Sequence, residues 1–290
     1  MINKSNVDFA KMEGIGNKIL VVDMRNRSDS INLHAINVLL SDEKTCFDQM
    51  MIIYSSKDTI ADAFIRIINR DGSEAQSCGN GMRCVVRFLS MRMKKKSFVF
   101  ETLRGTIKAK ENEDNSISVD MGEPIFNWKN IPLSQPFDSR DRDEFYLGPI
   151  NDVVLRSPYI LSMGNPHAIF FVEYDIYSYD LLGFGNIVKN HFMFPEGINL
   201  SIAKVTSCSS IDLRTCERGV GLTAACGTAA CASVVASAYS EKTNRIASVN
   251  MPGGQILIEW CHDNHVILTG TADEKWSGIL DVKNGKWLLI

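Results

Sequence analysis

The sequence predicts an α+β protein of two pseudo-symmetric domains, each a mixed β-sheet or barrel wrapped around one central helix, with the functional site in the interdomain cleft. Three observations predict this fold: an internal repeat, strand patterns in both halves, and a strongly apolar helical segment in each half. A helix that is apolar on every face has to be buried. The strands predicted in each half are the elements that can cover this helix.

An internal repeat relates the two halves of the chain. The stretches SCGNGMRC, residues 77–84, and ACGTAACA, residues 225–232, place two Cys-Gly pairs 148 residues apart. The same offset, applied without a gap, superposes Gly16 and Asn17 on Gly164 and Asn165, Arg66 on Arg214, Arg70 on Arg218, Gly105 on Gly253 and Gly122 on Gly270. We therefore expect two copies of one unit, near residues 8–124 and 156–272. The expected domains are 1–124, with residues 276–290 added, and 125–275.

Both halves contain strand patterns before and after one helix. Alternating or β-branched apolar residues predict strands at 19–24, 49–55, 63–69, 97–103, 168–173, 198–206, 210–216 and 255–260. Apolar spacing predicts helices over 82–93 and 228–240, and the second of these segments contains no charged residue. Each helix follows a Cys-Gly turn, so we expect function at the first turn of each helix.

Composition excludes several classes of function. The chain has 290 residues, 45% of them hydrophobic, and a formal net charge of -3. So small a charge attracts neither nucleic acid nor an anionic membrane surface. The sequence shows no signal-peptide pattern and no apolar run of membrane-spanning length. We expect a cytoplasmic protein whose partner is a small molecule or another protein chain.

The eight cysteines are expected to be reduced, mostly as small buried residues. Cys226 and Cys231 have a spacing that suggests zinc, but no matching second pair accompanies them, so we expect no metal.

The two Cys-Gly turns are candidate sites for a carboxylate and a reactive thiol. At a helix start, backbone N–H groups and the helix dipole favour an anion and lower the pKa of a thiol. One such cysteine alone is more simply a buried core residue. Two of them at symmetry-related positions predict sulfurs on opposite sides of a bound ligand.

Paired thiols suit one reaction, the removal of a proton from one face of a carbon and its delivery to the other face. The helix-start N–H groups would stabilise the carbanion through its carboxylate, so no carbonyl cofactor is needed. No histidine accompanies either turn in sequence; His167 in GNPH is the only candidate.

Several stretches together resemble the diaminopimelate epimerase family: KMEGIGNKILVVD, FDQ, NRDGSEAQSCGNGMRC, MGNPHAIFFV, GIN, ERGVGLTAACGTAACA and GGQILIEW. The resemblance extends along nearly the whole chain. It implies a cofactor-independent isomerase that interconverts LL- and meso-2,6-diaminopimelate, in the formation of lysine and of cell-wall precursors. It also implies a possible homodimer.

The resemblance assigns roles to residues of this sequence. Cys78 and Cys226 correspond to the acid/base thiols, and Glu217 and Arg218 suit the reacting ammonium and the distal carboxylate of the substrate. His167 corresponds to a residue that supports the site, although a hydrogen-bonded core histidine is an equally good interpretation. The remaining matched positions would hold substrate: Asn17, Gln49, Asn69, Gly79, Asn80, Asn165, Asn199, Gly227 and Thr228.

The sequence departs from the family pattern at Glu13, Lys18, Cys46, Leu222 and Ala229. None of these replaces a matched acid/base residue. Leu222 and Ala229 flank the second turn, which leaves the shape of that carboxylate site and the identity of the substrate open. Two alternatives therefore remain, a racemase of another amino acid such as histidine or proline and a non-catalytic amino-acid-binding protein.

Overall fold

The chain divides into two compact units, and the computed structural model describes residues 6–75, 78–138 and 144–290. The first unit comprises Met1–Asp120 and Thr269–Ile290, and the second comprises Met121–Leu268. The C-terminal segment therefore completes the unit that the N-terminal segment begins.

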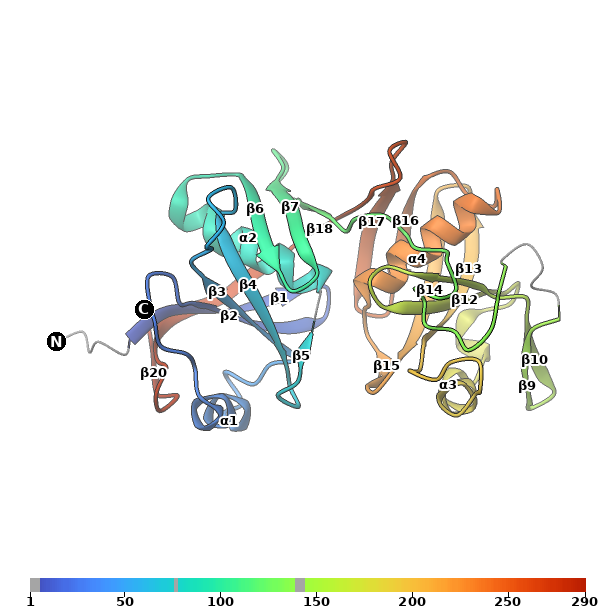
Figure 1. Cartoon of the computed structure of the whole chain (residues 1–290), viewed down its shortest axis with the longest axis horizontal. Helices are drawn as coiled ribbons and strands as arrows, with labels where there is room; N and C mark the ends of the chain where they lie inside the picture. The colour runs from blue at the N-terminus through green and yellow to red at the C-terminus, as the bar shows by residue number, and fades with distance from the viewer. Residues whose placement is uncertain (1–5, 76–77, 139–143) are drawn as a thin grey trace. The chain divides into compact units, whose positions relative to one another are not determined.

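The first unit is a mixed sheet with two helices (Figure 1). Its elements are β1 (Asn6–Gly14), β2 (Asn17–Asp23), α1 (Leu33–Ser41), β3 (Gln49–Tyr54), β4 (Ala63–Asn69), β5 (Glu74–Ala75), α2 (Gly79–Met93), β6 (Ser97–Thr102), β7 (Gly105–Glu111), β8 (Ile117–Asp120), β19 (Asp273–Asp281) and β20 (Trp287–Leu289). The strands pair in the order β20, β19, β1, β2, β3, β4, β6, β7, β8, and β5 pairs with β4. The pairs β2–β3 and β4–β6 are parallel, and the others are antiparallel.

The second unit repeats this arrangement. Its elements are β9 (Tyr146–Ile150), β10 (Val153–Arg156), β11 (Tyr159–Ser162), β12 (Pro166–Phe171), the 3-10 helix η1 (Ile176–Ser178), α3 (Leu181–Lys189), β13 (Asn199–Ser207), β14 (Ser210–Glu217), β15 (Gly221–Thr223), α4 (Gly227–Tyr239), β16 (Ile246–Met251), β17 (Gly254–Trp260) and β18 (Val266–Gly270), which crosses the unit boundary. The strands β11, β12, β13, β14, β16 and β17 pair in that order, and β15 pairs with β14. The pairs β12–β13 and β14–β16 are parallel, like their counterparts in the first unit.

Each unit contains one central helix, as predicted. Helix α2 contacts β1, β2, β3, β7, β8 and β19, and α4 contacts β11, β12, β13, β14, β16 and β17. In α4 every residue from Gly227 to Ser237 is buried, which explains why this segment carries no charge. The predicted strands all occur with small differences at their ends.

The sequence comparison assumed a repeat without gaps, but the structure shows a gap. Helices α1 and α3 are related by the offset of 148, but the strand register relates β3 and β13 by 150. Ile19 pairs with Gln49, whereas His167, the counterpart of Ile19, pairs with Asn199. The second unit therefore has two extra residues before β13 and two fewer between β13 and β14. As a result, Asn199 is the structural counterpart of Gln49.

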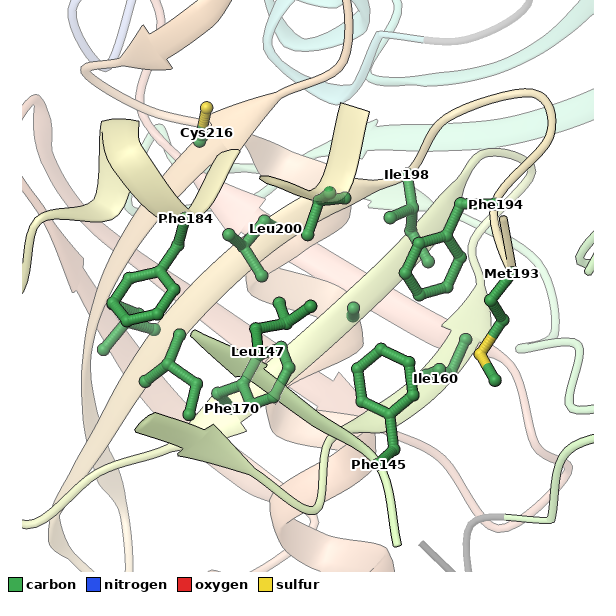
Figure 2. Close-up of a cluster of buried hydrophobic side chains, with 14 of the residues drawn as sticks. Phe145, Leu147, Ile160, Phe170, Phe184, Met193, Phe194, Ile198, Leu200 and Cys216 are labelled. Carbon is green, nitrogen blue, oxygen red and sulfur yellow. The ribbon is translucent and has the colours of Figure 1, made fainter. Parts of the chain in front are cut away.

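A cluster of large apolar side chains forms the second unit's core beside α3 (Figure 2). Phe145, Phe170 and Phe184 lie in it, together with Leu147, Leu200 and Cys216. The first unit has an equivalent cluster in which α1 contributes Ala35, Ile36 and Leu39. Neither α1 nor α3 was predicted from sequence; each has nine residues and begins at a side-chain cap, Asn32 or Asp180. In the described part of the chain, no helix has the length and apolar character needed to cross a membrane.

Two positions on α3 test the importance of this core. We expect Phe184→Ala to lower the free energy of unfolding by about 3–5 kcal/mol, because the ring is completely buried and its removal leaves a cavity. Leu182→Ala on the same helix is the control, because Leu182 is 49% exposed and should change stability by less than about 0.5 kcal/mol. Denaturant unfolding followed by circular dichroism measures both. Equal effects would contradict the assigned burial.

Candidate active-site elements in the two units

Cys78 occupies the position directly before helix α2. Its backbone is extended, with φ -153° and ψ 104°, and its Sγ accepts a hydrogen bond from the Gly81 backbone N–H at 3.1 Å. Cys78 is half-buried, while Gly79 and Asn80 are buried. A negatively charged sulfur accepts such a bond better than a thiol does. The geometry of this turn therefore fits a cysteine that acts as a thiolate.

Three further polar residues predicted in the first unit lie on adjacent strands. Gln49 and Asn69 are direct partners on β3 and β4, and the Gln49 Nε2 donates to the Asn69 Oδ1 at 2.9 Å. Asn17 opens β2, directly after Gly16, whose φ of 77° favours glycine. The structure thus brings Gln49 and Asn69 into contact and places Asn17 on the neighbouring strand.

Cys226 occupies the same position before helix α4, but its surroundings differ. It is buried, with φ -131° and ψ 108°, and its Sγ lies 3.4 Å from the Thr228 Oγ1. Burial raises the pKa of the Cys226 thiol well above its ordinary value, and the charge of Glu217 raises it further. The Thr228 hydroxyl and the Ala229 backbone N–H act in the opposite direction. The expectation that the helix start would lower the pKa is wrong at Cys226, because desolvation outweighs the helix.

Glu217 is the carboxylate next to this thiol. It lies at the end of β14, and burial raises its pKa, while the side chains of Thr223 and Cys226 lower it. Glu217 pairs with Gly221 on β15. Leu222, one of the departures from the family pattern, follows on the same strand, and its side chain is 47% exposed. A half-buried carboxylate beside a thiol is suited to receive an ammonium group.

Four further predicted residues of the second unit lie close together, and one of them, Arg218, directly follows Glu217. The Arg218 backbone N–H donates to the Asn199 Oδ1 at 2.9 Å, and the His167 Nε2 lies 3.0 Å from the Asn165 Oδ1. His167 and Asn199 are register partners on β12 and β13. The Asn199 Nδ2 is buried and has no hydrogen-bond partner among the residues that the structure describes. This orphaned donor can bind an acceptor of a ligand.

His167 is completely buried, which lowers its pKa to about 3; the positive charge of Arg218 contributes to the same shift. The imidazole is therefore neutral at physiological pH and does not supply a charge to the site. From its position beside Asn165, the imidazole can hold that side-chain amide in place.

Sequence reasoning missed Glu196 and Thr223. The Glu196 carbonyl oxygen accepts a hydrogen bond from the Arg218 guanidinium at 3.2 Å and so orients that side chain. A backbone contact of this kind leaves no side-chain pattern to detect. Thr223 acts on the ionisation of Glu217 from the short strand β15. In residues 6–75, 78–138 and 144–290, no group of three or more His, Cys, Asp or Glu side chains is arranged to hold a metal ion.

Comparison with known proteins decides the family. The family model for diaminopimelate epimerase matches residues 9–127 and 159–274. The chain belongs to this family. Diaminopimelate epimerase of Rhizobium meliloti (strain 1021) is 51% identical over 280 residues, which cover 96% of this chain and 93% of that protein. The Rhizobium leguminosarum bv. trifolii (strain WSM2304) protein of the same name is 50% identical, with coverage of 98% and 96%.

Solved structures of more distant proteins have the same fold. A PhzF-family phenazine biosynthesis protein of Bacillus anthracis aligns with a TM-score of 0.64 at 17% identity, covering 98% of this chain and 99% of that chain. A hydroxyproline epimerase of Agrobacterium vitis aligns with a TM-score of 0.63 at 14% identity, covering 97% and 94%. At these identities the likeness concerns the fold, a mixed-sheet α+β architecture built from two repeated units.

The neutral state of His167 predicts a pH dependence of stability. The folded-state pKa is about 3 and the ordinary value is 6.5, so the unfolded chain binds more protons between these limits. We expect acidification from pH 6.5 to destabilise the protein by up to about 1.4 kcal/mol per pH unit through this group. His167→Gln should lose that contribution. Urea unfolding of both proteins at pH 7, 6 and 5 measures the difference, and identical slopes against pH would refute it.

Proposed function

We propose that this chain interconverts LL- and meso-2,6-diaminopimelate, with Cys78 and Cys226 as acid and base on opposite faces of one α-carbon. The observation that carries the proposal is a cysteine directly before the central helix of each repeated unit, in a member of this family. Inversion of a stereocentre needs a base on one face and an acid on the other. Two equivalent turns supply one sulfur for each face.

The helix starts suit the α-carboxylate of the substrate. The first backbone N–H groups of α2 and α4 have no partners within their helices, and the helix dipoles add positive potential. Gly79 and Asn80, and Gly227 and Thr228, present these groups. Such donors stabilise the charge that develops when the α-proton leaves.

The proposed step moves one proton at each face. The thiolate removes the α-proton and becomes a thiol, while the C–H electron pair delocalises into the carboxylate. The second thiol then gives its proton to the carbon from the opposite face and becomes the thiolate. Because burial and Glu217 raise the pKa of Cys226, this cysteine is suited to start as the donor. The roles exchange in the reverse reaction.

The amides and Arg218 are proposed to hold the rest of the substrate. The exposed Arg218 side chain presents a positive charge, oriented by the Glu196 carbonyl, to the distal carboxylate. Asn199 adds the orphaned Nδ2 donor. Asn17, Gln49, Asn69 and Asn165 complete the polar set.

The proposed reaction serves lysine and cell-wall precursor formation, and we place it in the cytoplasm. The scheme uses only groups of the chain, so it requires neither metal nor pyridoxal phosphate. We also propose a homodimer, which sedimentation of the purified protein tests.

Single cysteine substitutions test the mechanism. Cys78→Ala and Cys226→Ala should each lower inversion of LL-diaminopimelate by about a thousandfold, because one face loses its proton carrier. Cys208→Ala is the control, since Cys208 is exposed on the surface and should have no effect. The reduced proteins are assayed with a chelator present, and circular dichroism of the substrate follows its inversion.

Near-normal inversion by either variant would refute the two-thiol mechanism. Absence of activity on diaminopimelate in the unmodified protein, together with turnover of histidine or proline, would favour a different racemase. Binding of amino acids without any turnover would favour a binding protein.

Arg218 tests the choice of substrate. Arg218→Ala should raise KM for diaminopimelate by about tenfold to a hundredfold, because the distal carboxylate loses a charge-assisted hydrogen bond. Arg218→Lys should recover part of the loss, since it keeps the charge but not the planar fork. Initial rates over a range of substrate concentrations measure both. Equal catalytic efficiency of the unmodified protein on alanine and diaminopimelate would contradict the assignment.

A further inference from the structure

Arg83 is a fully buried cation in helix α2. It has the largest of the completely buried side chains among the described residues. Removing a guanidinium from water is energetically costly. A positive charge near the N-terminus of a helix is also disfavoured by the helix dipole. Fold stability alone therefore gives little reason for an arginine at this position, and a nearby negative charge gives a better one.

The Arg83 guanidinium reaches back to the turn that carries Cys78. Side chains of a helix tilt toward its N-terminus. The Arg83 Nη2 donates to the Asn80 Oδ1 at 3.0 Å, and its Nε donates to the Thr271 carbonyl oxygen at 3.1 Å. Because a guanidinium only donates, it fixes which end of the Asn80 amide faces inward. The charge and the amide orientation at this turn therefore depend on one side chain.

The related turn of the second unit has the opposite arrangement. Under the offset of 148, the counterpart of Arg83 is the buried Cys231, whose side chain carries no positive charge, and the counterpart of Asn69 is Glu217. The first turn thus has a cation beneath it, and the second has a carboxylate beside Cys226. The two turns share a backbone geometry, but a buried cation contacts the first and a half-buried carboxylate lies beside the cysteine of the second.

Other ionisable groups face this end of α2 from the neighbouring strands. Glu13 on β1 and Asp273 on β19 are register partners, and both are solvent-accessible; Glu13 forms an ion pair with Lys275 at 2.8 Å. Cys84 lies on α2 itself, where burial raises its pKa to about 12 although the Arg83 charge acts to lower it. One turn farther along α2, Arg87 pairs with Glu111 on β7, and Lys18 on β2 is exposed. Arg83 is therefore the charge least screened by water here.

We infer that Arg83 is a positioning residue of the proposed reaction, whose buried charge keeps the Cys78 sulfur negative at rest and whose hydrogen bond fixes the Asn80 amide. The inference rests on the proposed role of Cys78 as an acid/base group. It assigns the resting thiolate to the first unit and the resting thiol to the second.

The test measures the reactivity of Cys78 directly. Iodoacetamide alkylation of the reduced protein, from pH 6 to 9, is quenched and the label at Cys78 is quantified by peptide mass spectrometry. Arg83→Gln keeps a hydrogen-bond donor without the charge and should lower the Cys78 alkylation rate at pH 7 about tenfold. Arg83→Lys keeps the charge and should stay within about threefold of the unmodified protein.

Arg87→Gln is the matched control. Arg87 lies one turn farther along α2 and donates to the next backbone carbonyl, that of Ala272, so its loss should leave the Cys78 rate unchanged. In turnover assays, Arg83→Gln should also lower kcat/KM more below pH 7 than above it, because fewer molecules carry the thiolate at low pH.

An unchanged Cys78 rate in folded Arg83→Gln would overturn the inference. If that variant does not fold, the unmodified protein still decides, because an alkylation midpoint of Cys78 at or above that of an ordinary thiol would also overturn it. The alkylation readout uses no substrate. If the unmodified protein does not turn over diaminopimelate but Arg83→Gln still lowers the Cys78 alkylation rate, the proposed reaction is rejected and the charge assignment stands.

Discussion

Burial of one helix inside the strands of each unit is the constraint on which the rest of the structure depends. Helix α4 carries no charge and α2 buries most of its length, so each sheet has to close around its helix. A buried helix leaves unpaired N–H groups at its first turn. Cys78 and Cys226 are the residues placed there, which makes the site a consequence of the same packing that stabilises the fold.

Duplication supplies two such turns, and divergence makes them different. The strand pairings and both helices are retained between the units, but Arg83 and Glu217 place opposite charges near the two cysteines. Ala229, one of the departures from the family pattern, is another position at which the two units differ. Its counterpart Gly81 leaves no room for a Cβ, which would lie 2.3 Å from the Met51 Sδ. In the second unit the register places the smaller Ser201 at the position of Met51.

The sequence predicted the features that arise from short-range patterns. The helix that follows each Cys-Gly turn and the eight strands depend on local apolar spacing, and the repeat depends on residue identity. Helices α1 and α3 were missed because their stability comes from packing on the core and from single capping residues. The shift of β13 by two residues is visible only in the register of hydrogen bonds. The pKa of Cys226 was expected to be lowered but is raised, because burial of a particular sulfur depends on tertiary contacts that the sequence does not show.

Isotope incorporation in the first turnovers tests the central claim, that two different sulfurs act on one carbon. LL-diaminopimelate is incubated with the unmodified protein in deuterated water, and both isomers are isolated at low conversion for mass spectrometry. The account predicts deuterium at the inverted centre of the meso product and none in the recovered LL substrate, because the removed proton and the delivered proton belong to separate thiols. Retention of the original hydrogen in the product, or equal labelling of both isomers, would contradict it.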